Sequence, residues 1–325
     1  MNILATRGGA VRAVAVAVAV AAFIVLSPCS SGGSNAAGSP TPSKSGPASP
    51  GSSASPGPAL TGAPVHLSLL ESDGTVYGVG MPIVAFFNRK VTDASAFDKA
   101  TTVTVNGAPA VGAWYWERSA RAGQVLEAHY RLQQYWPAHA KIEVAFPVKG
   151  LSAGNGLVYD DSLTLSIATG AANIATVDGA TKRMTVTSDG QPAMTLPVSL
   201  GKSKTPTYNG TKIVMEKDRV QRMMSTNPAD PYDLQVPWSV RLTSSGEFVH
   251  SASWNGGNIG IRSTSNGCTN LTVADAERYF NFAHIGDVFS YVNTGGPTTP
   301  SWDGYGDWNL SWTTWQAGGV LPSAR

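Results

Sequence analysis

Short apolar stretches separated by turn-forming residues recur along most of the chain, and they restrict the fold more than any other feature. In residues 63–169 the stretches include "VHLSLL", "IVAFF", "TTVTVNG", "KIEVAF" and "SLTLSIA", with Gly, Asp, Asn and Pro between them. Their length and their β-branched and aromatic content are typical of strands, and no helical period is sustained. This segment is therefore predicted to be a β-sandwich.

The same pattern continues in residues 170–293, with a tight hairpin expected at Asp189-Gly190 and another at residues 244–246. One helix is expected in "TVADAERYFNFAH", where Thr272 is a candidate N-cap and Asp275 stands at the capping-box position. A chain of 325 residues is long enough for two domains. We therefore predict a mostly β fold with a single short helix in its second half.

The N-terminal residues have a different composition. Arg7 and Arg12 precede an uncharged run that ends at Leu26. This run is too short to cross a bilayer comfortably and is typical of a signal peptide. Residues 1–28 are therefore predicted to direct export.

Cys29, directly after this segment, is a candidate for lipidation, although Pro28 is unusual before a lipidated cysteine. The alternative is ordinary cleavage nearby, for example after Ala36. Residues 29–62 are almost entirely Ser, Pro, Gly and Ala, a composition that predicts a disordered linker. The folded part is then expected at the outer face of the cell membrane, within reach of the cell wall.

The charge balance limits the possible partners. The chain has 23 Lys and Arg against 21 Asp and Glu, a formal charge of +2. So small a charge argues against electrostatic attraction to nucleic acid or to acidic lipid. We expect no nucleic-acid partner, and a membrane contact only through a lipid on Cys29.

Cys268 is the candidate nucleophile. It lies in the polar stretch "STSNGCTN", shortly before the expected helix. An unpaired thiol is unusual in an exported protein, and a helix N-terminus or a nearby imidazole lowers a thiol pKa. We predict a reactive thiolate; the alternative is a buried, inert cysteine.

His250 is the candidate base among five histidines, because it ends a strand from which the chain loops back to Cys268. His66, His129 and His139 are assigned to the surface or to packing, and His284 to the end of the helix. No HExxH or CxxC spacing is present, so no metal site and no cofactor are predicted.

The sequence around His250 and Cys268 resembles a known family. "HSASW" followed by "STSNGCTNL" is similar to the signature of the L,D-transpeptidases, and residues 199–210, 231–254 and 303–312 resemble the same family. "YGVGMPI", from Tyr77, resembles the immunoglobulin-like domain that often precedes it. The resemblance implies an immunoglobulin-like domain over 63–169, a catalytic domain over 170–293, and a Trp-rich extension over 294–325 that packs on the catalytic domain.

The resemblance also implies a function. Members of the family cross-link peptidoglycan outside the membrane: a cysteine forms a thioester with a donor tetrapeptide stem, and terminal D-alanine leaves. The side-chain amine of a second stem then attacks, giving a 3-3 cross-link. The expected partners are peptidoglycan stem peptides, and a monomer is expected.

The family's functional positions map onto this sequence residue by residue. Cys268 is implied as nucleophile, His250 as general base and Ser251 as the residue that orients the imidazole. The implied oxyanion-hole donors are the backbone N–H groups of Asn266, Gly267 and Cys268, and the implied pocket residues are Tyr232, Trp254, Ser265 and Asn270. Two of these assignments compete with simpler ones, since Trp254 could belong to the core and Asn270 could cap the helix.

Asn266 departs from the family pattern, which has histidine there, and asparagine cannot shuttle a proton near neutral pH. Asn266 therefore leaves open a catalytically silent wall-binding protein. An L,D-carboxypeptidase, in which water attacks the thioester, also stays open, because the sequence does not show whether the acceptor amine has a pocket. The loop "MMSTNPADPY", residues 223–232, is short for the family's substrate lid, so Met223 and Met224 are weak pocket candidates. The aromatic segments "WYWER" and the Trp-rich tail suit glycan contact, but packing is the expected use.

Overall fold

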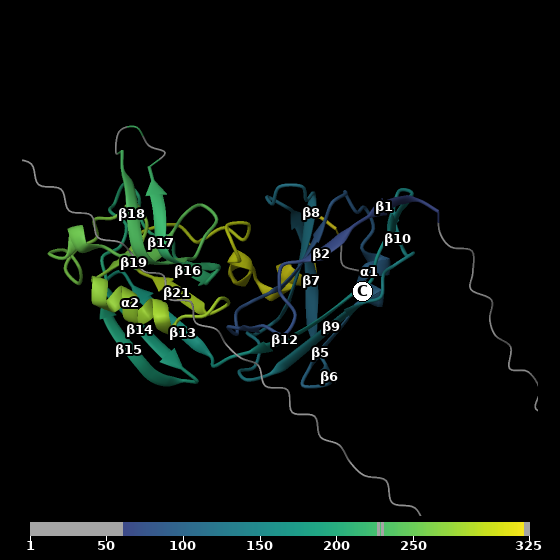
Figure 1. Ribbon diagram of the computed structural model, residues 1–325, viewed down its shortest axis with the longest axis horizontal. Helices are drawn as coiled ribbons and strands as arrows, with labels where there is room; N and C mark the ends of the chain where they lie inside the picture. The colour runs from purple at the N-terminus through teal and green to yellow at the C-terminus, as the bar shows by residue number, and fades with distance from the viewer. Residues whose placement is uncertain (1–60, 226–227, 229–230, 322–325) are drawn as a thin grey trace, which may run out of the picture. The chain divides into compact units, whose positions relative to one another are not determined.

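The computed structural model describes residues 61–225, 228 and 231–321 (Figure 1). The predicted signal peptide, Cys29 and nearly all of the predicted linker lie outside these residues. Within the described part of the chain, no helix combines the length and the apolar character that crossing a membrane requires.

The N-terminal domain is a β-sandwich, as predicted. Its strands are β1 (Ala63–Val65), β2 (Leu67–Leu69), β3 (Val76–Tyr77), β4 (Ile83–Phe87), β5 (Thr102–Val105), β6 (Ala108–Pro109), β7 (Gly112–Arg118), β8 (Leu126–Leu132), β9 (Lys141–Phe146), β10 (Ser152–Gly154), β11 (Leu157–Tyr159) and β12 (Leu163–Thr169). One sheet has the order β2-β4-β8-β7 and a second has the order β3-β12-β9-β5-β6. A small third sheet, β1-β11-β10, completes the domain.

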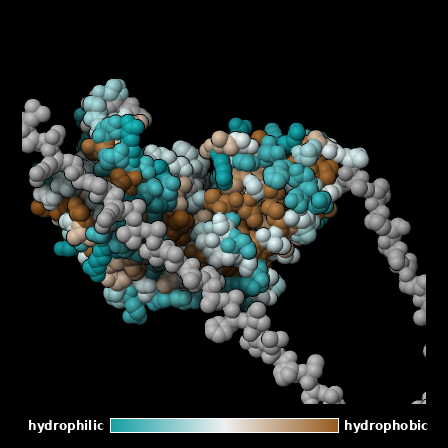
Figure 2. Space-filling view, in the orientation of Figure 1, coloured by the Kyte–Doolittle hydropathy of each residue, from teal (hydrophilic) through white to brown (hydrophobic). Residues whose placement is uncertain are grey.

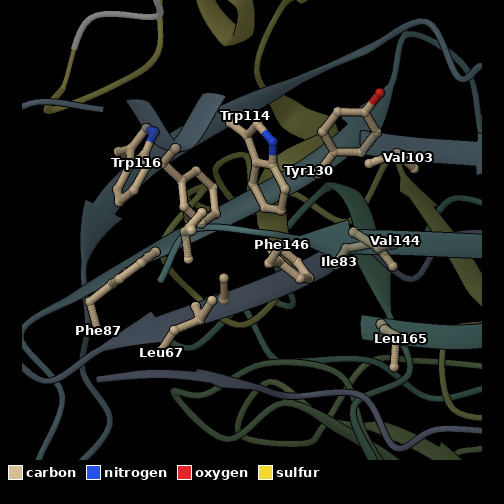
Figure 3. Close-up of a cluster of buried hydrophobic side chains, with 14 of the residues drawn as sticks. Leu67, Ile83, Phe87, Val103, Trp114, Trp116, Tyr130, Val144, Phe146 and Leu165 are labelled. Carbon is tan, nitrogen blue, oxygen red and sulfur yellow. The ribbon is translucent and has the colours of Figure 1, made fainter. Parts of the chain in front are cut away.

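Aromatic side chains fill the space between the two larger sheets (Figure 3). Trp116 is fully buried and stacks on Phe87 with ring centroids 4.9 Å apart. Trp114 points to the same side because side chains alternate along β7. The "WYWER" segment is therefore used for packing. Helix α1 (Ser95–Ala100), which was not predicted, adds Phe97 to this core.

The second domain contains two further sheets. Its strands are β13 (Asn173–Asp178), β14 (Arg183–Ser188), β15 (Gln191–Pro197), β16 (Gly210–Ile213), β17 (Glu216–Met224), β18 (Asp233–Arg241), β19 (Phe248–Ser251), β20 (Thr269–Leu271) and β21 (Val288–Val292). The sheet orders are β15-β14-β13-β21-β16 and β17-β18-β19-β20. A short 3-10 helix, η1 (Ser253–Asn255), follows β19.

The turns and caps of this domain follow the sequence signals. Asp189 and Gly190 both have positive φ, at 48° and 75°, as a two-residue type I′ hairpin requires. Helix α2 (Val273–Phe282) begins after Thr272, whose hydroxyl accepts a hydrogen bond from the Asp275 N–H at 3.1 Å. The predicted hairpin and the predicted Thr272 N-cap are both confirmed, and the Thr272 hydroxyl also donates to Asp275 Oδ2 at 2.7 Å. Helix α2 packs on β18 and β19, which carry part of the site.

The β17–β18 hairpin includes Met223 and Met224, the first residues of the segment expected to be a short lid. Its two strands have nine residues each and form a long two-stranded arm, whose tip includes positions outside the described residues. Figure 2 shows hydrophilic residues over much of the arm with apolar ones among them. Met224 is 56% exposed and Leu234 is 39% exposed, so the arm offers apolar contact beside the pocket.

The C-terminal extension, with η2 (Gly306–Asn309) and α3 (Trp312–Gln316), contacts both domains and not the second domain alone. Trp308 and Trp315 donate their indole N–H groups to Gly80 O and Ala113 O of the N-terminal domain, each at 2.9 Å. Asn309 donates to Thr211 O of the second domain at 2.8 Å. Most of the tail tryptophans therefore pack, as expected. The extension was expected to pack on the catalytic domain alone, but it packs on the N-terminal domain as well.

Candidate active site

Cys268 and His250 are brought together by two neighbouring strands. Cys268 directly precedes β20, and His250 lies in β19, which pairs with β20 in parallel so that His250 stands opposite Asn270. Both side chains line the same pocket, whose volume is about 260 Å³. The sequence prediction that a strand end and a returning loop meet here agrees with this arrangement.

The His250 imidazole is held by a main-chain oxygen. Its Nδ1 lies 2.8 Å from Ser251 O, and because a carbonyl only accepts, Nδ1 carries the proton. The lone pair is then on Nε2. His250 is 4% exposed, and burial lowers its pKa to about 4. The residue is a neutral imidazole at physiological pH.

The hydroxyl group of Ser251 does not contact this imidazole. Its Oγ donates to Pro237 O at 2.9 Å. Ser251 therefore fixes the histidine through its backbone, a distinction that the sequence motif cannot make.

The Cys268 thiol is half-buried and lies 3.7 Å from Gly246 O. Burial raises the pKa of Cys268 to about 11, and the Glu247 carboxylate adds to the increase. The expected thiolate of lowered pKa is therefore wrong. The reason is local, because β20 separates Cys268 from the start of α2, so the thiol does not stand at the helix N-terminus.

The backbone around Cys268 is held in an unusual conformation. Gly267 has φ +122°, a region that favours glycine, and its carbonyl accepts from Thr207 Oγ1 at 2.6 Å. Ser265 Oγ donates to Cys268 O at 2.6 Å and accepts from the Gly267 N–H at 3.2 Å. The Ser265 hydroxyl thus shapes the loop. Ser265 also lines the pocket, and its contact with substrate stays a prediction.

Two of the three predicted oxyanion donors remain available. Within the described part of the chain, the backbone N–H groups of Asn266 and Cys268 donate to no protein group, whereas that of Gly267 is used by Ser265. The Asn266 side chain is exposed, and its Oδ1 accepts from Thr205 Oγ1 at 3.3 Å.

A buried ion pair behind the loop escaped the sequence analysis. Lys212 of β16 is 1% exposed, and its Nζ bonds to Glu247 Oε2 and, at 2.8 Å, to Tyr208 O. The ammonium lies 3.9 Å from the ring centroid of Tyr291. Burial lowers the pKa of Lys212 and raises the pKa of Glu247. Only the three-dimensional fold brings these two residues together, so no sequence spacing could have indicated the pair.

The walls of the pocket include the other predicted residues. Tyr232 and Trp254 are 36% and 55% exposed, so Trp254 is not a core residue. Its ring centroid is 6.0 Å from that of His250. Asn270 is 3% exposed, and its Oδ1 has no hydrogen-bond partner among the described residues. Since Thr272 caps α2, Asn270 is not the cap.

A second pocket of about 410 Å³ adjoins the first. Both pockets are lined by Met223, Tyr232, Asn266 and Cys268. The second one adds polar groups, among them Arg222, Arg241, Ser244 and Ser245, and also Met224. The two methionines that were weak candidates thus both line pockets, and Cys268 lies where the pockets meet.

Comparisons with known proteins agree with this geometry. A profile described as the L,D-transpeptidase catalytic domain matches residues 172–297, and that of a bacterial Ig domain matches residues 60–152. The chain is 35% identical over 267 residues to L,D-transpeptidase 2 of Mycobacterium tuberculosis. The matched region covers 79% of this chain and 64% of that protein. It is 30% identical to L,D-transpeptidase 1 of the same species over 241 residues, 72% of this chain and 88% of that one.

A solved structure leads to the same class of protein. The LD transpeptidase LdtMt1 in complex with imipenem matches with a TM-score of 0.58 and 29% identity, covering 69% of this chain and 97% of that chain. The fold is thus an immunoglobulin-like sandwich followed by a β-rich L,D-transpeptidase catalytic domain, as predicted. The chain belongs to the L,D-transpeptidase family. It spans 64% of the length of L,D-transpeptidase 2.

Proposed function

We propose that this protein is an L,D-transpeptidase that forms 3-3 cross-links between peptidoglycan stems through a thioester on Cys268. The observation that carries the proposal is the position of Cys268 at the junction of two pockets, with His250 lining one of them. A nucleophile reachable from two sides suits a reaction that uses a donor and an acceptor. No cofactor is required.

The first half-reaction acylates Cys268. Sγ attacks the carbonyl carbon of the third residue of the donor stem, while His250 Nε2 takes the thiol proton. Because the resting pair is a neutral thiol and a neutral imidazole, proton transfer accompanies attack and does not precede it. The C–N bond to terminal D-alanine then breaks, and His250 returns the proton to the leaving amine.

The tetrahedral intermediate carries a negative oxygen that needs hydrogen-bond donors. The backbone N–H groups of Asn266 and Cys268 are suited to this role, since neither is used inside the protein part that the structure describes. The N–H of Gly267 would have to leave Ser265 before it could take part. Preorganised donors of this kind contribute roughly 3–4 kcal/mol each to transition-state stabilisation.

The second half-reaction transfers the acyl group. The side-chain amine of the third residue of an acceptor stem attacks the thioester carbon, the C–S bond breaks, and the amine proton passes through His250 to the thiolate. This restores the thiol and gives the 3-3 link. The polar second pocket supports a place for the acceptor, and it favours transpeptidation over an L,D-carboxypeptidase, for which water would suffice.

The donor stem is assigned to the first pocket. Tyr232 and Trp254 give it aromatic walls, and the buried Asn270 Oδ1 offers an acceptor to a substrate N–H. Asn266 stands in place of the family's histidine, and we assign it a positioning role through Thr205. This assignment makes the histidine dispensable for chemistry and argues against the catalytically silent alternative.

The site of action follows from the N-terminal residues, which lie outside the described part of the chain. We infer export by a signal peptide over residues 1–28, a lipid anchor on Cys29 and a linker over 29–62. A monomer at the outer face of the membrane would then cross-link the wall and contribute to cell shape.

The experiment that tests the chemistry is acylation by a carbapenem. We expect imipenem to acylate Cys268, because the relative LdtMt1 was solved in complex with imipenem. The intact mass of the protein should rise by one drug equivalent, whereas Cys268→Ala should remain unmodified. An unmodified wild-type protein, or an adduct that persists in Cys268→Ala, would overturn the proposal.

A further inference from the structure

Three side chains with metal-binding atoms converge on one face of the N-terminal domain. Glu117 lies in β7, and Glu127 and His129 lie in β8, where Glu117 stands directly opposite Glu127. His129 is two positions after Glu127, so it projects from the same face of the sheet. The opposite face of these strands carries the apolar core, including Trp116.

Burial disfavours the charged form of His129, but Asp307, Glu127 and Glu117 raise its pKa well above the usual value, so without a metal the cation between the two carboxylates is a proton on this imidazole. The side chains of Glu117 and Glu127 are 13% and 16% exposed, and like charges directly opposite each other destabilise an antiparallel pair. Other acidic groups lie near, since Asp307 of η2 contacts His129 and the buried Glu71 interacts electrostatically with His129. Arg131, in β8, is used by the tail, because it donates to Leu310 O at 3.0 Å and lies over Trp315.

One nitrogen points into this cluster without a hydrogen bond. His129 is 2% exposed, and its Nε2 has no hydrogen-bond partner among the described residues. This nitrogen lies 3.5 Å from Glu127 Oε1 and 3.8 Å from Glu117 Oε1. Ligands bound to zinc at about 2.0–2.1 Å in a tetrahedral arrangement are separated by about 3.4 Å. The spacing is therefore too wide for good hydrogen bonds and close to that of a zinc coordination shell.

Neighbouring groups orient the three candidate ligands. Asp307 Oδ2 lies 3.0 Å from His129 Nδ1, which places a proton on Nδ1 and makes Nε2, toward the two carboxylates, the atom that binds a metal once its own proton is displaced. Ser119 Oγ donates to Glu127 Oε2 at 2.7 Å, so Oε1 of this carboxylate remains for a metal. A carboxylate behind a metal-ligating histidine is the usual arrangement in zinc proteins.

We propose that Glu117, Glu127 and His129 form a binding site for a divalent transition metal ion, of which zinc fits the donor set best. The fourth position is left to water. Through Asp307 the ion ties β7 and β8 to η2 of the C-terminal extension, so it stabilises the contact between that extension and the N-terminal domain. The sequence did not predict this site, because its ligands come from two paired strands and do not follow a metal-binding motif within one helix.

Zinc binding is tested on the full chain carrying Cys29→Ala and Cys268→Ala, which removes both thiols as competing ligands. The metal-free protein is titrated with zinc chloride in a calorimeter, in the presence of a chelator of known affinity that competes for the ion. A second titration uses Co²⁺ in place of zinc and follows its visible absorption spectrum. We expect one equivalent of zinc per chain and a raised Tm on binding. Glu117→Gln and His129→Gln should each weaken binding at least about tenfold.

The matched control is His139→Gln, since His139 is 64% exposed and pairs with Asp189 away from the cluster. Its zinc affinity should equal that of the parent. Far-UV circular dichroism of each metal-free variant checks folding, and if His129→Gln fails to fold, Glu117→Gln decides alone. The proposal would be overturned if the protein showed no saturable zinc binding, which would mean that the cluster holds only a proton on His129. It would also be overturned if Glu117→Gln bound zinc with unchanged affinity.

Discussion

The imidazole of His250 donates its Nδ1 proton to the main-chain oxygen of Ser251 at 2.8 Å. The hydroxyl of Ser251 is directed elsewhere, to Pro237 O. Imipenem should therefore acylate Ser251→Ala at a rate within about tenfold of the wild-type rate. The acylation rate of His250→Gln should fall by roughly 10²–10⁴-fold, as expected when a general base is removed. Stopped-flow acylation rates of both variants test this, and equal losses would mean that the serine side chain orients the imidazole.

The pH dependence should be that of a neutral pair. His250 has its pKa lowered to about 4 and Cys268 has its pKa raised to about 11. The base is lost only as pH falls through about 4, and the thiol ionises only near 11, so the acylation rate should be flat between about pH 6 and pH 9. Ultraviolet absorbance of the thiolate should be absent over the same range. A thiolate signal at neutral pH would contradict the neutral pair.

The buried pair of Lys212 and Glu247 should be coupled in stability. Glu247→Gln leaves the 1%-exposed Lys212 without its carboxylate and should lower the free energy of unfolding by about 3–5 kcal/mol. Replacing both residues, in Lys212→Met with Glu247→Leu, should cost less than the sum of the single changes. Urea unfolding of the wild type, Lys212→Met, Glu247→Leu and the double variant measures the coupling, and additive losses would show that the two charges act independently.

Gly267→Ala should impair the oxyanion hole more than the fold. The nearest atom to an added Cβ is 3.7 Å away, so the cost is backbone strain at φ +122°, about 1–3 kcal/mol. Shifted N–H groups should reduce acylation by roughly 10²–10³-fold. Gly257→Ala is the matched control, because an added Cβ there meets nothing within 4 Å. If Gly267→Ala were acylated at the wild-type rate, the positive φ at Gly267 would not be needed for catalysis.

Much of the fold could be predicted because local signals decide it. Alternating strands, the Asp189-Gly190 turn and the Thr272 cap each depend on neighbouring residues, and each is found where the sequence placed it. The His250 and Cys268 pairing could be predicted from a strand and a returning loop. These features need no knowledge of distant packing.

The errors concern burial and long-range contact. The raised pKa of Cys268 depends on how deeply the loop is packed, and the buried Lys212 pairs with a residue 35 positions away. The roles of the Ser251 backbone and the Ser265 hydroxyl depend on hydrogen bonds that a motif does not specify. Spacing in the sequence carries no information on any of these.

The most direct test of the account is product analysis with tetrapeptide muropeptides. Wild-type protein should convert them into dimers joined through their third residues, with release of one D-alanine per link, as read by tandem mass spectrometry, and Cys268→Ala should form none. Tripeptide monomers without dimers would contradict transpeptidation and establish hydrolysis, and unchanged substrate would contradict an active enzyme.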